Sequence, residues 1–365
     1  MAHEHYTNAH LTLTQATGDP TGSVRWQSPS NIALVKYWGK HGRQLPRNPS
    51  VSLTLQEARS ETRIAYRPAR QRSRGVDLKF YFEGSERPDF GERIAQYLGS
   101  IVDVYPFLEE VELEIHSSNT FPHSAGIASS ASAMSAIATA LCDMERRLFA
   151  TLTDEVTFNK KASYLSRLGS GSACRSVYPV AAAWGATEAV PSSSDLYAVP
   201  VGEVIDPVFE SYHDDILIVS RAEKSVSSSA GHRLMEGNAY ATPRYLQADE
   251  RLHRLMDAMK AGDLETFGEL TEQEALTLHA LMMTSDPAYV LMEPDSLRCI
   301  QIVQAWRRDT HKPLYFTLDA GPNLHLLYPD SIAEEVSQLI DSELRQYCNR
   351  GEVIRDRVGQ GSSPY

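Results

Sequence analysis

The chain has 365 residues, of which 42% are hydrophobic and 22% are charged, a balance that excludes disordered and collagen-like proteins. Its 35 lysines and arginines against 47 aspartates and glutamates give a formal net charge of −12. Nucleic acids and anionic membranes both need a basic surface, so we expect neither as a partner. A small anionic substrate is still compatible with this charge, because a few local cations in a pocket can hold it.

Length, the first residues and the cysteines together predict a two-part cytoplasmic protein. At about 150 residues per domain, the chain is long enough for two domains or for one two-lobed body. The first twenty residues lack the apolar core of a signal peptide, and no apolar run reaches about 18 residues, the length of a membrane-spanning helix. The four cysteines show no C-x-x-C spacing, so we expect reduced thiols and no zinc site.

Strand patterns come first along the chain, and helical patterns follow them. After a strand-rich segment at 28–38, apolar and polar residues alternate at 51–55, 78–83 and 111–115, which predicts strands with one buried face each. From residue 129 the apolar residues take helical spacing. We expect helices over 129–149 and 154–168.

The second half repeats the mixture of strands and helices. A surface connection is expected at 191–200, and we place the boundary between the two parts there. The later patterns predict strands at 216–219, 314–318 and 324–328, and helices at 243–260, 264–283, 295–308 and 332–347. Strands and helices in both halves favour an α+β fold or two-layer α/β sandwiches.

A small-residue loop, PHSAGIASSAS at 122–132, joins the strand at 111–115 to the helix at 129–149. Gly126 permits a tight turn, and Ala128, Ser129 and Ser130 leave backbone N–H groups open at a helix N-terminus, where a phosphate is favoured. The serine hydroxyls can bind phosphate oxygens or Mg²⁺. An ordinary serine-capped helix explains the same residues. The loop matches neither the Walker nor the dinucleotide motif.

Three further clusters carry candidate chemistry, and each has a structural alternative. Lys36 and Lys40 flank an aromatic pair and a glycine in KYWGK, which is either a solvated face or a strand end with a binding site. Arg175 follows a glycine–serine turn, and this segment is either a helix-capping linker or a site where the arginine binds a carboxylate or phosphate. Asp319 follows a predicted strand, and its carboxylate either caps the turn or accepts a proton. The Ser-rich segment 224–229 is a weaker candidate.

In this order the segments resemble the GHMP small-molecule kinase superfamily and, within it, the ATP-dependent mevalonate diphosphate decarboxylases. The resemblance covers residues ~25 to ~330. Loop 122–132 is similar to the nucleotide-phosphate loop of the superfamily, whereas KYWGK, GSGSACR and DAGPN are typical of the decarboxylase branch. The resemblance implies a GHMP-kinase-like fold of two lobes with the active site in the cleft between them. We expect a frayed segment at 1–22 and lobes at 23–195 and 196–365.

The resemblance also implies a reaction, a requirement for ATP and Mg²⁺, and a set of site residues. The family converts (R)-5-diphosphomevalonate and ATP to isopentenyl diphosphate, ADP, phosphate and CO₂ in the mevalonate pathway, and homodimers are expected. ATP and Mg²⁺ are therefore implied. The catalytic residues would be Asp319, Lys36 and Arg175; the substrate-binding residues Tyr37, Trp38, Lys40, Ser170, Ser172 and Ser228; and the ATP-binding residues Ser124, Gly126, Ala128, Ser129 and Ser130, with Ser130 also beside Mg²⁺.

Two related activities stay open at this point. Ser229 stands where some bacterial members carry an arginine for the diphosphate, so a decarboxylase acting on 5-phosphomevalonate is an alternative. A mevalonate-type kinase is the other, although such a kinase need not hold the substrate carboxylate as firmly as Arg175 would. A non-catalytic binding protein on the same fold would be expected to have lost Asp319, Lys36 or Arg175, and all three are present.

Overall fold

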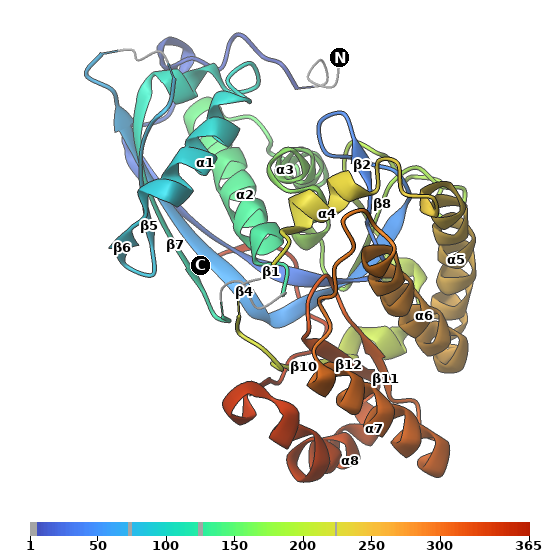
Figure 1. The fold of residues 1–365 in the computed structure, drawn as a ribbon. Helices are drawn as coiled ribbons and strands as arrows, with labels where there is room; N and C mark the ends of the chain where they lie inside the picture. The colour runs from blue at the N-terminus through green and yellow to red at the C-terminus, as the bar shows by residue number, and fades with distance from the viewer. Residues whose placement is uncertain (1–5, 72–74, 123–126, 223–224) are drawn as a thin grey trace.

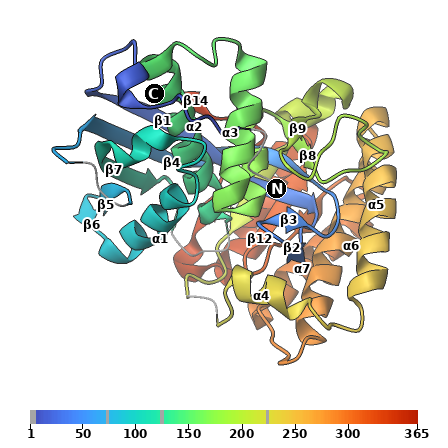
Figure 2. The same cartoon turned by 90° about the horizontal axis from the view of Figure 1, so that it is seen from above.

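The computed structural model describes residues 6–71, 75–122, 127–222 and 225–365, and it has a mixed α/β fold built on two sheets (Figures 1 and 2). The larger sheet has the order β14-β1-β4-β7-β5-β6, with β8 and β9 attached beside β4. All its neighbours are antiparallel except the parallel pair β5 and β7. Its strands are β1 (Gly22–Val35), β4 (Ser50–Pro68), β5 (Asp77–Phe82), β6 (Ser85–Glu86), β7 (Val111–Asn119), β8 (Ala181–Trp184), β9 (Val199–Pro200) and β14 (Ser363–Pro364).

Three helices pack beside the larger sheet, as Figure 1 shows. They are α1 (Pro88–Gly99), α2 (Ser129–Phe149) and α3 (Glu155–Gly169). The predicted helix at 129–149 is confirmed residue for residue. The helix predicted at 154–168 is also confirmed, with Asp154 as its N-cap accepting a hydrogen bond from the Thr157 N–H at 2.7 Å. A 3₁₀ segment, η3 (Gly171–Val177), follows α3 and packs back against it.

The smaller sheet is antiparallel, with the order β11-β12-β10-β13, and helices α4 to α8 come from the same half of the chain, with α6 and α7 packed against strand β11. In both views α5 and α6 run side by side, and Figure 1 shows α7 and α8 at the lower end of the molecule. These elements are β10 (His213–Leu217), β11 (Tyr315–Thr317), β12 (Leu324–Tyr328), β13 (Val353–Ile354), α4 (Ser228–Leu234), α5 (Ala241–Ala261), α6 (Leu264–Met283), α7 (Pro294–Thr310) and α8 (Ala333–Leu339). A short hairpin of β2 (Lys40–His41) and β3 (Leu45–Pro46) follows β1.

Two expectations about these strands need correction. The segment 51–55 is buried on both faces, not one. Val51 and Leu53 pack in a cluster with residues of α5, while Ser52 on the opposite face contacts Arg175 of η3. The expected surface connection at 191–200 ends inside the fold, because Val199 pairs with Ala183 of β8 and is buried. The alternation of apolar and polar residues alone does not show whether another element covers the polar face of a strand.

The helix predicted at 332–347 is also divided. It starts as α8, continues as a π-helical turn at Ile340–Leu344 and ends as a 3₁₀ turn at Arg345–Tyr347. Its apolar residues Val336, Leu339, Ile340 and Leu344 still face one core. The winding therefore changes along the segment while the apolar stripe stays buried. In the described part of the chain, no helix is both long and apolar enough to cross a bilayer.

One hydrophobic cluster joins the two halves on either side of the expected boundary at 195/196. Val35 and Leu53 from the larger sheet share it with Leu252 of α5 and Phe267 of α6. The end of β1 therefore rests against α5 and α6. The domain limits at 1–22, 23–195 and 196–365 stay a prediction.

The C-terminal segment crosses back to the larger sheet, which no sequence pattern indicated. Asp356 is buried, and its carboxylate accepts hydrogen bonds from the backbone N–H groups of Gln56, Glu57 and Ala58 at 2.8–2.9 Å. These three N–H groups lie in β4, between its pairing with β8 and its pairing with β7. Asp356 thus satisfies backbone donors that the sheet leaves unpaired.

We expect Asp356→Ala to lower the free energy of unfolding by about 3 kcal/mol, because three backbone N–H groups, one buried and two partly buried, lose their acceptor. Urea denaturation measures the change. The control is Asp257→Ala on α5, where the side chain is 81% exposed, and its effect should stay within about 0.5 kcal/mol. Equal, small effects in both variants would contradict this role of Asp356.

Candidate functional site

The centre of the site is an ion pair between the two halves of the chain. Lys36 directly follows β1, and its Nζ lies 3.1 Å from Oδ1 of Asp319 and 2.5 Å from the carbonyl oxygen of Ala33. The Lys36 side chain is 2% exposed and that of Asp319 is 25% exposed. Burial lowers the pKa of Lys36, and the negative charge of Asp319 opposes that shift. The carboxylate is thus the member of the pair that solvent, or a substrate, can reach.

Asp319 lies in the turn between β11 and β12, and two contacts fix that turn. The backbone carbonyl of Asp319 accepts a hydrogen bond from Nε2 of His279 on α6 at 3.1 Å. The Asn323 side chain accepts from the Ser220 N–H at 2.9 Å and donates to the Ser220 carbonyl at 3.1 Å. The turn between two antiparallel strands therefore holds the carboxylate at a fixed place, as expected for Asp319 at a strand end.

Arg175 lies close enough to Asp319 for their charges to interact, and two serines hold its side chain. Its Nε donates to Oγ of Ser52 at 3.0 Å and its Nη1 to Oγ of Ser50 at 2.7 Å, both from β4. The residue is 1% exposed, and burial lowers its pKa, with Asp319 among the charges opposing the shift. Two sides of the guanidinium are thus taken by the protein. Nη2 makes no hydrogen bond to the described residues, so a substrate carboxylate could bind there while both serines stay in place.

Ser170 and Ser172 lie at the start of η3 and help shape this region. Ser170 is the N-cap of η3, and the Ser172 carbonyl accepts from the Asn31 side chain at 3.2 Å. Asn31 also donates to Oγ of Ser176 at 2.8 Å. These bonds tie β1 to η3, and so they bring the serine–arginine segment beside the strand that ends at Lys36.

The aromatic pair after Lys36 packs around a histidine that no sequence motif singled out. His232 of α4 contacts the rings of Tyr37 and Trp38 at centroid distances of 4.4 and 4.7 Å. Its Nδ1 accepts a hydrogen bond from the Gly39 N–H at 2.9 Å. Gly39 has φ +102°, and a Cβ there would lie 2.3 Å from Oη of Tyr245, so glycine is required. The Ser-rich segment before His232 was the only sequence signal near it.

Two cations near these rings, Lys40 and Arg233, are close enough for their charges to interact. Lys40 of β2 donates to Oε1 of Gln44 at 3.0 Å, and its pKa is lowered by burial and by the charge of Arg233 on α4. Within the described chain, neither Lys40 nor Arg233 has a carboxylate in an ion pair. Ser228 begins α4, the same short helix, with Ser227 as its N-cap. An unneutralised pair of this kind favours an anionic ligand.

The expected phosphate loop is described only in part, because Ser124 and Gly126 lie outside the described residues. Ala128 is the N-cap of α2 with φ +45°, and no side chain caps the helix. Ser129 and Ser130 form its first turn, which contains no acidic residue. Among the described residues, the backbone N–H groups of Ser129 and Ser130 have no acceptor, which gives the 21-residue helix an electropositive end. This end fits a phosphate group.

Comparisons with known proteins place the chain in one family. The family model described as diphosphomevalonate decarboxylase-like N-terminal domain matches residues 28–198, and that of the mevalonate 5-diphosphate decarboxylase C-terminal domain matches residues 215–361. The diphosphomevalonate decarboxylase of Ganoderma lucidum is 30% identical over 354 residues, which cover 91% of this chain and 84% of the relative. The chain belongs to the diphosphomevalonate decarboxylase family.

Solved structures extend the likeness to the diphosphomevalonate decarboxylase fold. The mevalonate diphosphate decarboxylase of Staphylococcus aureus matches with a TM-score of 0.80 and 27% identity, covering 94% of this chain and 98% of that one. MDDEF in complex with MVAPP, AMPPCP and magnesium matches with a TM-score of 0.79 and 26% identity, over 94% and 99% of the two chains. The mixed α/β fold is therefore that of the family.

The buried His232 gives a pH prediction. Burial, with the charge of Lys40, lowers its pKa to about 3, whereas the unfolded chain has the usual value near 6.5. Because the unfolded chain takes up the proton first, stability is lost as the pH falls below about 6.5. This group should remove about 2 kcal/mol of stability between pH 7 and pH 5.

The matched variant is His232→Asn, whose amide oxygen can still accept from Gly39 but does not titrate. Chemical denaturation at both pH values should show a steeper loss for the native chain than for the variant. Equal slopes would mean that His232 is not held neutral in the folded protein.

Proposed function

We propose that this chain catalyses the ATP-dependent decarboxylation of (R)-5-diphosphomevalonate to isopentenyl diphosphate, with ADP, phosphate and CO₂ as the other products. Membership of the diphosphomevalonate decarboxylase family supports the assignment. The observation that carries it within the chain is the Lys36–Asp319 ion pair, with the partly exposed Asp319 carboxylate close to the buried cation of Arg175. The reaction needs a proton acceptor at the tertiary hydroxyl and a cation at the carboxylate, and these two substrate groups are separated by one CH₂ group.

Asp319 would act first, on the tertiary hydroxyl of the substrate. Its carboxylate would orient the hydroxyl and accept its proton as the oxygen bonds to the γ-phosphorus of ATP and ADP leaves. Lys36 keeps a positive charge at this carboxylate and near the transferring phosphoryl group. Phosphoryl transfer depends mainly on positioning and charge stabilisation, and a buried pair of fixed geometry supplies both.

Arg175 would act in the second stage. The C–O bond to the new phosphate breaks, the bond to the carboxylate carbon breaks, and its electron pair forms the alkene as CO₂ leaves. A single contact from Nη2 to the carboxylate leaves the bonds of Arg175 to Ser50 and Ser52 in place. Ser170 and Ser172, at the start of η3, would add hydroxyl donors. A single hydrogen bond would orient the carboxylate and still allow CO₂ to leave.

The diphosphate would lie over the second group of cations. Lys40 is the central candidate, because it has a hydrogen bond to Gln44 but no carboxylate partner among the described residues. Tyr37, Trp38 and Ser228 line the same region through the contacts of α4 with the KYWGK segment. Arg233, whose charge acts on Lys40, is an additional candidate that no sequence motif indicated.

The N-terminus of α2 is the proposed place of the ATP phosphates. Its uncapped first turn offers the N–H groups after Ala128 together with the hydroxyls of Ser129 and Ser130, and Ser124 and Gly126 are expected to complete the loop. Magnesium, when bound with ATP, supplies neutralising charge to the phosphate oxygens. Ser130 stays the proposed neighbour of that ion, and MDDEF was solved with AMPPCP and magnesium.

The same arrangement supports two lobes with the site in a cleft between them. Lys36 and Arg175 come from the first half of the chain, whereas Asp319 comes from the second. A homodimer and a cytoplasmic location remain expectations from the family resemblance.

The substrate assignment is tested with mevalonate, its 5-phosphate and its 5-diphosphate, each supplied with ATP and Mg²⁺. We expect CO₂ and phosphate release from the 5-diphosphate, because Lys40 and Arg233 form an unneutralised cationic pair. Release of CO₂ only from the 5-phosphate would identify a phosphomevalonate decarboxylase, which Ser229 leaves open. ADP formation without CO₂ would identify a kinase.

The role of Asp319 is tested by Asp319→Asn, which keeps the shape and removes the proton acceptor. We expect kcat to fall by roughly 10³-fold or more, the scale of losing one key catalytic group. ATP binding, measured by calorimetry, should stay nearly unchanged, since the α2 terminus is untouched. Normal turnover by this variant would remove Asp319 from the mechanism.

A further inference from the structure

We propose that helix α6 sets the geometry of the Lys36–Asp319 pair through two positioning residues, Glu274 and His279. Each of them binds the backbone of one member of the pair, and neither would touch the substrate. The inference rests on the proposed function, since it concerns the same two catalytic residues. It adds the element that holds those residues at their working distance.

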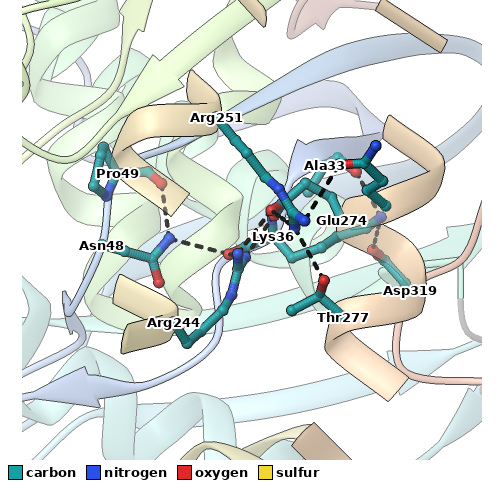
Figure 3. A network of polar contacts seen from close by, with 10 residues as sticks. Ala33, Lys36, Asn48, Pro49, Arg244, Arg251, Glu274, Thr277 and Asp319 are labelled. Atoms are coloured by element: carbon teal, nitrogen blue, oxygen red, sulfur yellow. Dashed lines mark hydrogen bonds and ion pairs between the residues drawn. The ribbon is translucent and has the colours of Figure 1, made fainter. Parts of the chain in front are cut away.

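Glu274 holds Lys36 at the point where β1 ends. Its Oε2 accepts a hydrogen bond from the Lys36 backbone N–H at 2.9 Å (Figure 3). β1 pairs with β4 only as far as Val35, so this N–H has no partner in the sheet. A buried N–H without an acceptor is costly, and the carboxylate of Glu274 supplies the acceptor. The backbone of Lys36 is thereby fixed to α6.

Two arginines of α5 keep Glu274 ionised and in place. Arg244 donates through Nη1 to Oε1 at 2.7 Å and through Nη2 to Oε2 at 2.5 Å, and Arg251 donates to Oε1 at 2.9 Å. The Glu274 and Arg244 side chains are 0% and 1% exposed. Burial alone would raise the pKa of Glu274, but the arginine charges and their hydrogen bonds lower it below its ordinary value. Such a fully bonded carboxylate has little freedom to move.

Further contacts close the network around Lys36, as the dashed lines in Figure 3 show. The Lys36 carbonyl accepts from Nδ2 of Asn48 at 3.1 Å and from Nη2 of Arg244 at 3.3 Å. The residue is thus bonded at its N–H, at its carbonyl and at its side chain. Bonds at these three points restrict the position of the Lys36 ammonium group.

His279 holds the backbone of Asp319, the other member of the pair. It is 2% exposed, and its Nε2 donates to the backbone carbonyl of Asp319 at 3.1 Å. Glu274 and His279 are five residues apart on one helix, a rise of about 7.5 Å along its axis. Lys36 and Asp319, which are 283 positions apart in the chain, are therefore both tied to one rigid element. The 3.1 Å contact between them depends on α6.

The chain contains a matched control for Glu274. Glu272, also buried on α6, pairs with Arg307 at 2.6 Å and accepts the Phe316 N–H at 3.3 Å, but it does not bond to Lys36. Glu272→Gln and Glu274→Gln thus remove the same kind of buried carboxylate from the same helix. A merely structural role predicts similar losses of stability and activity in both variants.

We expect Glu274→Gln to lower kcat by about 10- to 100-fold, since misplacing reacting groups by about 1 Å costs up to that much. KM for ATP and for the 5-diphosphate should change by less than about threefold. Glu272→Gln should keep kcat within about threefold of the native value. Comparable loss of kcat in both variants at comparable thermal stability would overturn the positioning role of Glu274.

His279 provides a second, independent test in case Glu274→Gln folds poorly. His279→Leu removes the donor to Asp319 and should lower kcat about tenfold with little change in KM. His279→Gln places an amide donor near the position of Nε2 and should recover kcat to within about threefold of the native value. Failure of glutamine to rescue what leucine loses would count against a role through this hydrogen bond.

Crystal structures of the variants give a readout that does not depend on turnover. The Lys36–Asp319 distance should lengthen in Glu274→Gln and His279→Leu but not in Glu272→Gln. An unchanged distance in both would overturn the inference whatever the substrate proves to be. Absence of native turnover with all three mevalonate substrates would instead overturn the proposed function.

Discussion

The ion pair between the buried Lys36 and the partly exposed Asp319 is the interaction on which the rest of the site depends. A lysine that is 2% exposed keeps its charge only beside a carboxylate, because removing an ammonium group from water without a counter-ion is costly. The pair also joins the end of β1 to the turn after β11, so the two sheets must meet for it to form. Lys36 can therefore stay charged only where the two sheets meet, which is also where the site is assembled.

A second constraint is that two buried arginines in this region have no carboxylate partner among the described residues. Arg175 bonds to two serines, and Arg167 bonds to the carbonyl oxygens of Leu196 and Arg43 at 2.7 and 2.6 Å. Burial lowers the pKa of both arginines. Lys40 lies nearby without a carboxylate in the described chain. An acidic protein of net charge −12 thus concentrates unneutralised positive charge in one region, which suits an anionic substrate.

Much of the fold follows from local sequence patterns. The helices at 129–149 and 264–283 have the predicted limits, because long amphipathic segments are strong local signals. The strand at 324–328 is confirmed, and it pairs with the strand predicted at 314–318. The doubly buried segment 51–55 and the C-terminal return through Asp356 were not predictable. Both depend on partners about 125 to 300 positions away in the chain.

The sequence by itself determined which residue types the site contains. Lys36, Arg175 and Asp319 each stand in a short motif whose residue types already indicate its chemistry. Tertiary structure alone decided how they are held: Arg175 by serines of β4, Gly39 by His232, and the backbones of Lys36 and Asp319 by Glu274 and His279 on one helix. The physical reason is that hydrogen-bond partners of buried groups are chosen by packing, which brings together residues that no local pattern relates.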